Sequence, residues 1–255
     1  MDTLYHILNI ERNKFIAFNK YLSTQKNMPS VIFLHGLMSH MNSTKSLFLA
    51  NYCKKADYNF ITFDNFGHGN SSGNFIEETI GSWLNGLEIV LERLADQPTI
   101  LVGSSMGAWL AILAAMKFPN KITSLICLAS AVDFTEESIW KNLTKSQKKQ
   151  MEQEKHLEIT GTNCNDKYPI SYQLILEARN HLLLNLDTIA LSAPIHLIHG
   201  MKDVDVPYNI STQLVEKITS DMVVIKLIKN GDHRLARQDE LSIITNSLEE
   251  LILVK

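Results

Sequence analysis

The chain has 255 residues, 45% of them hydrophobic and 20% charged, with a formal net charge of −3. This is ordinary globular composition, and the length suits one large domain. The charge balance excludes the strongly basic surface of a typical nucleic-acid-binding domain, so we expect no nucleic-acid partner. No apolar run approaches the roughly 18 residues that span a bilayer, and the N-terminal stretch lacks a secretory signal. We therefore expect a protein without a membrane span that is located in the cytoplasm.

Short apolar runs alternate with longer helical patterns along the chain. In chain order we expect paired strands at 5–10 and 14–19, a strand at 30–34, a helix ending near 55, a strand at 59–63, a helix at 77–95, a strand at 100–102 that leads into a helix, a strand at 124–129, a strand at 194–199, a helix at 209–218, a strand at 222–228 and a helix at 239–253. Such alternation predicts a mostly parallel sheet covered by helices on both faces. The predicted fold class is therefore α/β.

The alternation is interrupted at residues 133–187, where the pattern is helical and polar. We therefore divide the chain into a core, formed by 1–132 and 188–255, and a helical cap insertion at 133–187. Ligands of open α/β sheets bind at the carboxyl edge of the strands, so the insertion is expected to lie over that edge as a lid. The charged run KSQKKQ at Lys145–Gln150 is interpreted as a solvated helix face.

The segment GSSMG at Gly103–Gly107 lies between an apolar run and a helical pattern. It fits the G-x-S-x-G motif in the strand–turn–helix context that the motif requires. The central serine then occupies a strained turn with its hydroxyl clear of the backbone, and the residues two before and two after it must lack a side chain. The following helix directs free N–H groups toward the same spot. Ser105 is therefore the predicted nucleophile, against the alternative of an incidental serine in a tight turn.

A serine hydroxyl needs a general base, and the base needs an orienting carboxylate. In this fold the order along the chain is serine, acid, histidine. Asp203 follows the strand at 194–199 and is the predicted acid, with Asp205, also a possible helix cap, as the near competitor and Asp133 as the outside candidate. His233, in the loop KNGDHRL before the last helix, is the predicted base. The other histidines downstream of Ser105 are interpreted as core or surface residues: His156, His181, His196 and His199.

A tetrahedral intermediate of acyl transfer needs two N–H donors. One is expected from the backbone of Met106, the residue after the nucleophile, and the other from the loop after the strand at 30–34. That loop contains His35, Gly36 and Leu37. Because Gly36 permits a bend, the backbone N–H of Leu37 is the expected second donor, and His35 is interpreted as a structural hydrogen-bonding residue.

Two other patterns point to no cofactor. The loop GHGNSSG at 67–73 follows a strand but lacks the third glycine and the directly following helix of a dinucleotide site, so it is interpreted as part of the rim of the site. The three cysteines, Cys53, Cys127 and Cys164, are widely spaced and odd in number. This argues for free thiols in a reducing compartment and against a disulfide framework or a zinc site.

Together, the segments HG at 35–36, DNFGHGNSSG, GSSMG, HGMKDVDVP and GDHRL resemble the α/β-hydrolase superfamily. More narrowly, the chain resembles the abhydrolase-domain group of small carboxylesterases and palmitoyl-protein thioesterases, which has mitochondrial and α-proteobacterial members. The segments behind this likeness are MSHMNSTK, GSWLNGLEIVLERL, ASAVDFTEESIW, YPISYQLILEARNHLLL and KNGDHRLARQDEL. The resemblance covers nearly the whole chain. It implies the same triad and the same backbone donors, although Ala108 stands where close relatives often have a second glycine.

These observations predict a serine hydrolase that cleaves a carboxylic ester or thioester through an acyl-serine intermediate, with no metal or organic cofactor. The acyl group is expected to be apolar and to contact Met38, Trp109, Phe134 and Trp140. The alternatives are an amidase or peptidase, an acyltransferase, a carbon–carbon bond hydrolase, or a non-catalytic binding protein, because fold does not determine function. A dehalogenase is disfavoured, since that chemistry on this fold uses an aspartate at position 105. The oligomeric state is left open.

Overall fold

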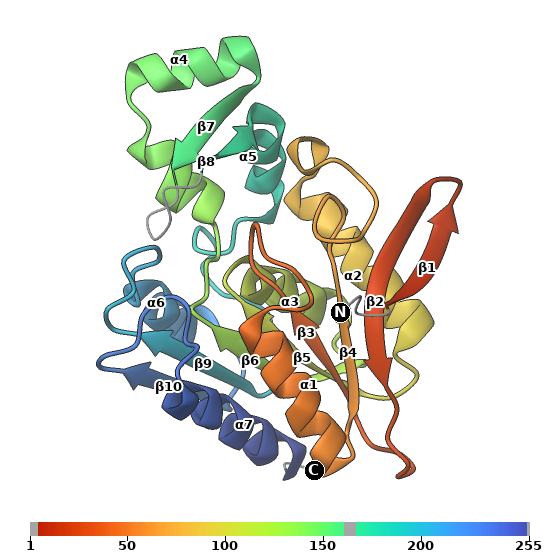
Figure 1. The fold of residues 1–255 in the computed structure, drawn as a ribbon. Helices are drawn as coiled ribbons and strands as arrows, with labels where there is room; N and C mark the ends of the chain where they lie inside the picture. The colour runs from red at the N-terminus through yellow and green to blue at the C-terminus, as the bar shows by residue number, and fades with distance from the viewer. Residues whose placement is uncertain (1–4, 161–166, 254–255) are drawn as a thin grey trace.

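The computed structural model describes residues 5–160 and 167–253. Within them, eight strands form one sheet in the order β1-β2-β4-β3-β5-β6-β9-β10 (Figure 1). Their bounds are β1 His6–Glu11, β2 Lys14–Tyr21, β3 Ser30–Leu34, β4 Asn59–Phe63, β5 Thr99–Ser104, β6 Ile122–Leu128, β9 Ile195–Gly200 and β10 Val223–Ile228. β2 pairs antiparallel with β1 and β4, and all pairs from β4 to β10 are parallel. The predicted α/β class with a mostly parallel sheet is confirmed.

Helices cover both faces of this sheet. The helices of the core are α1 Thr44–Ala56, η1 Phe75–Glu77, α2 Ile80–Leu94, α3 Met106–Lys117, α6 Asn209–Lys217 and α7 Gln238–Leu253. Buried side chains of α2, α3 and α6 belong to one hydrophobic cluster, and those of α1 and α7 belong to a second cluster. The two clusters lie on opposite faces, because successive side chains of a strand point to opposite sides of a sheet. Figure 1 shows the same layering.

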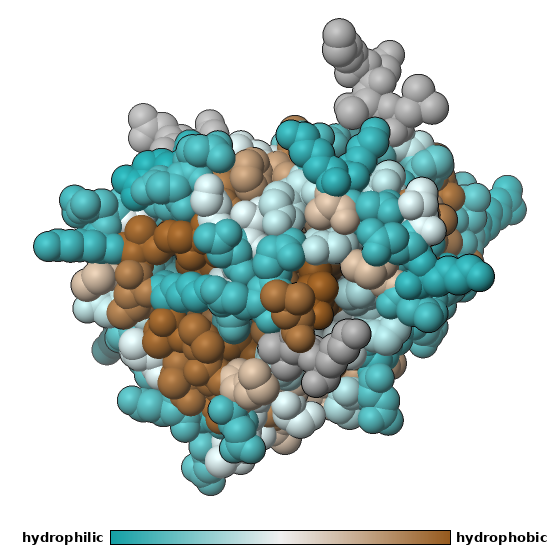
Figure 2. Space-filling model, turned by 90° about the horizontal axis from the view of Figure 1, so that it is seen from below, coloured by the Kyte–Doolittle hydropathy of each residue, from teal (hydrophilic) through white to brown (hydrophobic). Residues whose placement is uncertain are grey.

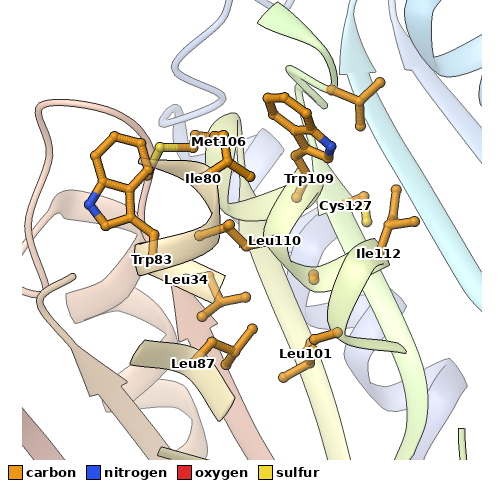
Figure 3. Packing of buried hydrophobic residues seen from close by; sticks show 14 of the residues in the cluster. Leu34, Ile80, Trp83, Leu87, Leu101, Met106, Trp109, Leu110, Ile112 and Cys127 are labelled. Atoms are coloured by element: carbon orange, nitrogen blue, oxygen red, sulfur yellow. The ribbon is translucent and has the colours of Figure 1, made fainter. Parts of the chain in front are cut away.

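The central strands are apolar because both of their faces are covered. Every residue of β3 and β5 is buried. Figure 3 shows Leu34 of β3 and Leu101 of β5 close to Leu87 of α2 and Leu110 of α3, and all four have 0% exposure. Fully burying each such side chain stabilises the fold by ~2 kcal/mol. This rigid core supports the ends of β3, β5 and β9, from which the candidate site is built.

The insertion between β6 and β9 is only partly helical. Its elements are η2 Thr135–Ile139 (a π-helix), η3 Trp140–Asn142, α4 Lys145–Glu154, β7 His156–Thr160, β8 Lys167–Ser171, α5 Tyr172–Ala178 and η4 Arg179–His181. β7 and β8 pair antiparallel as a separate two-stranded sheet, so the insertion predicted to be helical also contains two strands. The signal was available, since the apolar residues Leu157 and Ile159 alternate with polar ones at strand period.

A buried aspartate connects the two ends of the insertion. The carboxylate of Asp133, 1% exposed, accepts hydrogen bonds from the backbone N–H groups of Leu183, at 2.9 and 3.0 Å, and Leu184, at 2.8 Å. Asp133 also has a φ of 56°, which is unusual for a residue other than glycine. Burial raises the pKa of Asp133 to about 6, although these N–H groups act in the opposite direction. Figure 1 shows α4, β7, β8 and α5 of the insertion projecting above the main sheet.

Two of the three cysteines are free and buried, as expected for thiols of the core. Burial raises the pKa of Cys53 to about 12, and it also raises that of Cys127. Both therefore stay protonated near neutral pH and are poor nucleophiles. Cys164 lies outside the described residues.

The surface carries some apolar area, but the described helices contain no membrane span. None of them is both long enough and apolar enough to cross a bilayer. Figure 2 shows the end of the molecule opposite to the insertion, where apolar side chains gather on one part of the surface. On the edge strand β10, Val224 and Leu227 are 40% and 39% exposed.

Candidate active site

Ser105 occupies a strained turn between β5 and α3. Its φ is 57° and its ψ is −118°, a combination that residues with a side chain rarely adopt. The backbone around it is held on both sides, because the N–H of Ser105 donates to the carbonyl of Leu128 at 2.8 Å and its own carbonyl accepts from Ala108 and Ala131 at 3.0 and 3.3 Å. Such strain persists only where the surroundings impose it. The hydroxyl therefore projects from a rigid backbone at the carboxyl end of β5.

The two glycines of GSSMG are required by close packing of backbones. A Cβ on Gly107 would lie 2.8 Å from the carbonyl oxygen of His35 and closer still to that of Leu34, and a Cβ on Gly103 would overlap the backbone of Gly107. Neither glycine has a positive φ. The expectation that both positions must lack a side chain is thus met, but the neighbours that impose it are the end of β3 and the first turn of α3.

Ser105, His233 and Asp203 form a hydrogen-bonded chain. The Nε2 atom of His233 is 3.1 Å from Oγ of Ser105, and its Nδ1 atom is 2.7 Å from Oδ2 of Asp203. Since an ionised carboxylate only accepts, Nδ1 carries the proton and Nε2 accepts from the serine hydroxyl. The three residues follow the carboxyl ends of β5, β9 and β10. Ser105 and His233 are 128 positions apart in the sequence.

The carboxylate of Asp203 is buried and fully hydrogen-bonded. The side chain is 0% exposed. Oδ1 accepts from the backbone N–H groups of Asp205 and Val206 at 2.9 and 2.8 Å, while Oδ2 accepts from His233 and, at 3.1 Å, from His199. Burial alone would raise the pKa of Asp203, but the hydrogen bonds from the two imidazoles and from Val206 hold it below its usual value. The carboxylate is therefore ionised and fixed in orientation near neutral pH.

Of the two competing acids, Asp133 lies at the insertion and Asp205 lies beside Asp203. Asp133 binds the backbone of the insertion and makes no recorded contact with His233. Asp205 contributes its backbone N–H to Asp203. Its predicted role as a helix cap is wrong, because the residue before α6 is Tyr208, which makes no side-chain cap. Of the candidate acids, Asp203 is the one whose carboxylate is 2.7 Å from Nδ1 of His233.

Besides His233, four histidines follow Ser105 in the sequence, and three of them lie away from the hydrogen-bonded chain. His156 is bonded to the carbonyl of Glu154, His181 pairs with Glu177 at 2.6 Å, and Nδ1 of His196 is 3.5 Å from Glu250. The fourth, His199, contacts Asp203 directly, so its interpretation as an ordinary core residue missed a neighbour of the site. A polar ring at the end of an apolar strand, four residues before the predicted acid, was the available signal.

A lysine of α1 contacts the loop that carries His233. The Nζ atom of Lys45 donates a hydrogen bond to the backbone carbonyl of Arg234. Burial lowers the pKa of Lys45 to about 8, although Asp232 and Glu240 nearby act in the opposite direction. Sequence reasoning missed this residue as well, because nothing in the helical pattern of α1 indicates a contact almost 190 positions later.

The loop after β3 lies directly against the serine. A Cβ on Gly36 would be 3.1 Å from Cβ and 3.6 Å from Oγ of Ser105. The N–H of Met38 donates to Nε2 of His68 at 3.3 Å, whereas the N–H of Leu37 donates no hydrogen bond within the described part of the chain. Met106 is the first residue of α3, where N–H groups lack an acceptor within the helix. Both predicted donors thus flank Ser105 and are available to a ligand.

Two neutral histidines hold this loop. Nδ1 of His35 donates to the carbonyl of Gly36 at 2.7 Å, and its Nε2 accepts from the N–H of Asn65 at 3.1 Å. Because the carbonyl of Gly36 and the N–H of Leu37 belong to one planar peptide and point in opposite directions, His35 fixes the direction of that N–H. Burial lowers the pKa of both His35 and His68 to about 4. The predicted structural role of His35 agrees with these bonds.

The described residues contain one group whose spacing could suit a metal ion. Ligand atoms of Asp203, Asp205 and His233 lie within 4.8 Å of one another. However, Oδ1 and Oδ2 of Asp203 each accept two hydrogen bonds, and Nδ1 of His233 carries the proton it donates to Asp203. A metal would have to displace that proton and those donors. The hydrogen bonds of Asp203 and His233 therefore already use the atoms that a metal ion would need.

A cavity of about 400 Å³ lies between the insertion and α6. Glu137 and Lys141 of the insertion line it, together with Val132, Val206 and Asn209 of the core. Val206 also donates its N–H to Asp203, so the cavity adjoins the loop of the acid. Its lining is mixed in polarity.

The aromatic residues expected around an acyl group have other contacts. Trp109 is fully buried, packs edge-to-face on Phe134 at 5.8 Å and donates its Nε1 hydrogen bond to the carbonyl of His181. Trp140 lies in the insertion near the ring of Tyr172. Met38 is 54% exposed. None of these predicted residues lines the 400 Å³ cavity, and Trp109 anchors the insertion to α3.

Comparisons with known proteins identify chains of similar sequence and fold. A family model described as alpha/beta hydrolase fold matches residues 29–159. The bovine palmitoyl-protein thioesterase ABHD10, mitochondrial, is 35% identical over 239 residues, which are 91% of this chain and 76% of the relative. Among solved structures, alpha/beta hydrolase domain-containing protein 10 from mouse has a TM-score of 0.89 at 32% identity, and a putative hydrolase from Agrobacterium vitis S4 has 0.90 at 29% identity. Each of these two covers 98% of both chains.

The prediction of a cytoplasmic location is contradicted by these comparisons. The relative that matches 91% of the chain is named as a mitochondrial protein. The prediction rested on features that bear only on secretion and membrane insertion, and such features cannot distinguish the cytoplasm from an organelle.

The sequence and structural similarities extend over almost the whole chain, and the proteins they identify are hydrolases by name. They include the thioesterase group that the sequence resembles, which confirms that resemblance. The chain therefore belongs to the alpha/beta hydrolase fold family, and its relatives indicate a hydrolase.

Proposed function

We propose that this protein is a serine hydrolase that cleaves carboxylic thioesters or esters through an acyl-serine intermediate. The observation that carries the proposal is the chain Ser105–His233–Asp203, with distances of 3.1 and 2.7 Å, beside two unused backbone N–H groups. A nucleophile, a base, an orienting acid and an oxyanion site are what acyl transfer requires. In this proposal Ser105, His233 and Asp203 are the triad, and Leu37 and Met106 are the oxyanion donors.

The reaction would run in two halves. Oγ of Ser105 attacks the carbonyl carbon while Nε2 of His233 takes its proton, and Asp203 stabilises the imidazolium that forms. The N–H groups of Leu37 and Met106 stabilise the oxyanion. The tetrahedral intermediate then expels the thiol or alcohol, which receives the proton from His233. Water, deprotonated by His233, attacks the acyl-serine, and release of the acid restores the serine hydroxyl.

For the substrate we favour a thioester with a long apolar acyl group. The support is similarity to a protein named palmitoyl-protein thioesterase, at 35% identity over 91% of this chain. In the same proposal, residues 133–187 act as a cap on a core formed by 1–132 and 188–255, and the cap borders the path by which the substrate enters. The cavity between η2 and α6 lies on that border, where it is placed to receive the polar part of the substrate.

The test compares matched thioesters and oxyesters of increasing acyl length, using wild type, Ser105→Ala and Ser104→Ala. Ser104 is the adjacent, buried last residue of β5, so its substitution is a matched control. We expect Ser105→Ala to lower kcat by at least about 10³-fold, and Ser104→Ala to retain activity. Preference for long thioesters would support the favoured substrate class. Near-normal turnover by Ser105→Ala would refute the proposed nucleophile, and Ser105-dependent turnover of amides alone would favour an amidase.

A further inference from the structure

We infer that His199, locked by Ser211, is a positioning residue that shares Oδ2 of Asp203 with His233 and thereby tunes the support that Asp203 gives to the general base. The inference deepens the function proposed above and rests on it. It starts from one observation: a single carboxylate oxygen accepts hydrogen bonds from two imidazole rings, at 2.7 Å from His233 and 3.1 Å from His199.

The proton positions on His199 follow from its partners. Its side chain is 0% exposed, and its Nε2 atom lies 3.1 Å from Oδ2 of Asp203 and 3.0 Å from the carbonyl oxygen of Val206. Both partners are acceptors, so Nε2 carries the proton. Nδ1 is then a lone pair that accepts from the hydroxyl of Ser211, at 2.7 Å. Ser211 is itself 0% exposed and belongs to α6, so α6 fixes both the ring and its tautomer.

Sharing Oδ2 has an electrostatic consequence. A hydrogen bond to a carboxylate stabilises its negative charge, so the N–H of His199 makes Asp203 a weaker partner for His233. When His233 takes the proton of Ser105, the imidazolium is stabilised by an oxygen whose charge is already partly compensated. Loss of the N–H of His199 should therefore leave His233 more basic and Asp203 less firmly oriented. The higher basicity of His233 would shift the pH dependence of the reaction, whereas a loss of packing alone would not shift it.

Other charged groups lie near Asp203 and His233, and they must remain unchanged in a test. Lys45 of α1 interacts electrostatically with Asp203, and Asp232, Arg234 and Glu240 in turn act on Lys45. Asp232 and Arg234 flank His233 in the chain. Asp205 lies in the same loop as Asp203. Since the substitutions below alter none of them, a shift in pH profile reports on His199.

The chain offers a matched control on the same strand. His196, like His199, is a buried histidine of β9, but its Nδ1 atom lies 3.5 Å from Glu250 of α7, away from Asp203. We therefore compare His199→Leu, which removes the N–H, with His199→Gln, whose amide N–H reaches a similar position, and with His196→Leu. His199→Phe keeps a ring of similar shape without the N–H, and it serves if His199→Leu fails to fold.

The readout is the second-order rate constant for inactivation by a fluorophosphonate, measured from acidic to alkaline pH on the full-length protein. The hydroxyl of Ser105 adds to phosphorus and fluoride leaves, so this reaction needs the nucleophile and base without any knowledge of the natural substrate. Its acid limb reports protonation of the general base. We expect His199→Leu to lower the rate constant about tenfold and to move the acid limb up by about half a pH unit. His199→Gln should restore most of the rate constant and most of the position of the acid limb. His196→Leu should change neither the rate constant nor the acid limb.

The outcomes separate this inference from the proposed function. An unmoved acid limb in folded His199→Leu, or in His199→Phe if the first variant does not fold, would overturn the tuning role even if the rate falls. Equal shifts of the acid limb in His199→Leu and His196→Leu would also overturn the tuning role. A moved limb without turnover of any ester or thioester would support His199 and refute the proposed function. Failure of Ser105 to react at all would overturn both.

Discussion

Substituting Gly107 by alanine tests the reason for the second glycine of GSSMG. Its φ is not positive, so alanine can adopt the backbone conformation, and the cost must come from packing. The added Cβ would lie 2.8 Å from the carbonyl oxygen of His35 and closer to that of Leu34, whereas ordinary contacts begin at 3.4 Å. The end of β3 and the start of α3 must therefore separate by at least 0.6 Å. Neither neighbour is a flexible side chain that could move aside.

Overpacking of this kind costs ~1–3 kcal/mol, and we place Gly107→Ala at the upper end because both neighbours are backbone. Alanine recovers up to ~1 kcal/mol of helix propensity, so the net loss is ~2 kcal/mol. For a chain of this size the expected fall in Tm is ~4–8 °C. The same displacement separates the loop of Leu37 from the first turn of α3, so reaction with a fluorophosphonate should fall more than the loss of stability explains.

Gly86→Ala in α2 is the matched control. A Cβ there would lie 3.4 Å from Cε2 of Phe66, an ordinary contact. The helix gains ~1 kcal/mol from the loss of a glycine, so its Tm should be equal to or slightly above that of wild type. Thermal unfolding followed by circular dichroism, together with the fluorophosphonate rate, gives both readouts. Wild-type stability and reactivity of Gly107→Ala would refute the argument from close packing.

Two further predictions concern buried ionisable groups. Because the pKa of Asp133 rises from 3.8 to about 6 on folding, the native state binds this proton more tightly, and the contribution of Asp133 to stability falls by ~3 kcal/mol between about pH 4 and pH 6. Urea unfolding across that range should show this fall in wild type and lack it in Asp133→Asn; identical pH slopes would contradict the assignment. Lys45→Met removes the hydrogen bond to Arg234 and should lower kcat about tenfold with little change in Tm, and unchanged kcat would show that His233 is positioned without Lys45.

Much of the fold could be predicted from the sequence because its periodicity is local. The buried parallel strands are short, continuous apolar runs, and β3 and β4 have the expected bounds, 30–34 and 59–63. The insertion was the exception. There the strands β7 and β8 are half exposed and pair with each other away from the main sheet, so their alternating pattern is short and lies within a largely polar segment.

The positions of Ser105, Asp203 and His233 could be predicted because each follows a strand, and the carboxyl ends of parallel strands meet at one edge of the sheet. The roles of these three residues remain a proposal. Contacts perpendicular to the strands could not be predicted in this way. The bond from Lys45 to the loop of His233 depends on how α1 packs beside α7, which no local pattern encodes.

The sequence by itself determined the order of the strands and helices of the core and the positions of Ser105, Asp203 and His233 after its strands, because hydrophobic period and turn chemistry act over a few residues. Only the tertiary structure decided that Oδ2 of Asp203 serves two imidazoles, that Asp133 closes the insertion, and that His35 orients the peptide of Leu37. These are hydrogen bonds of buried groups, whose geometry depends on distances between elements that the packed core alone sets.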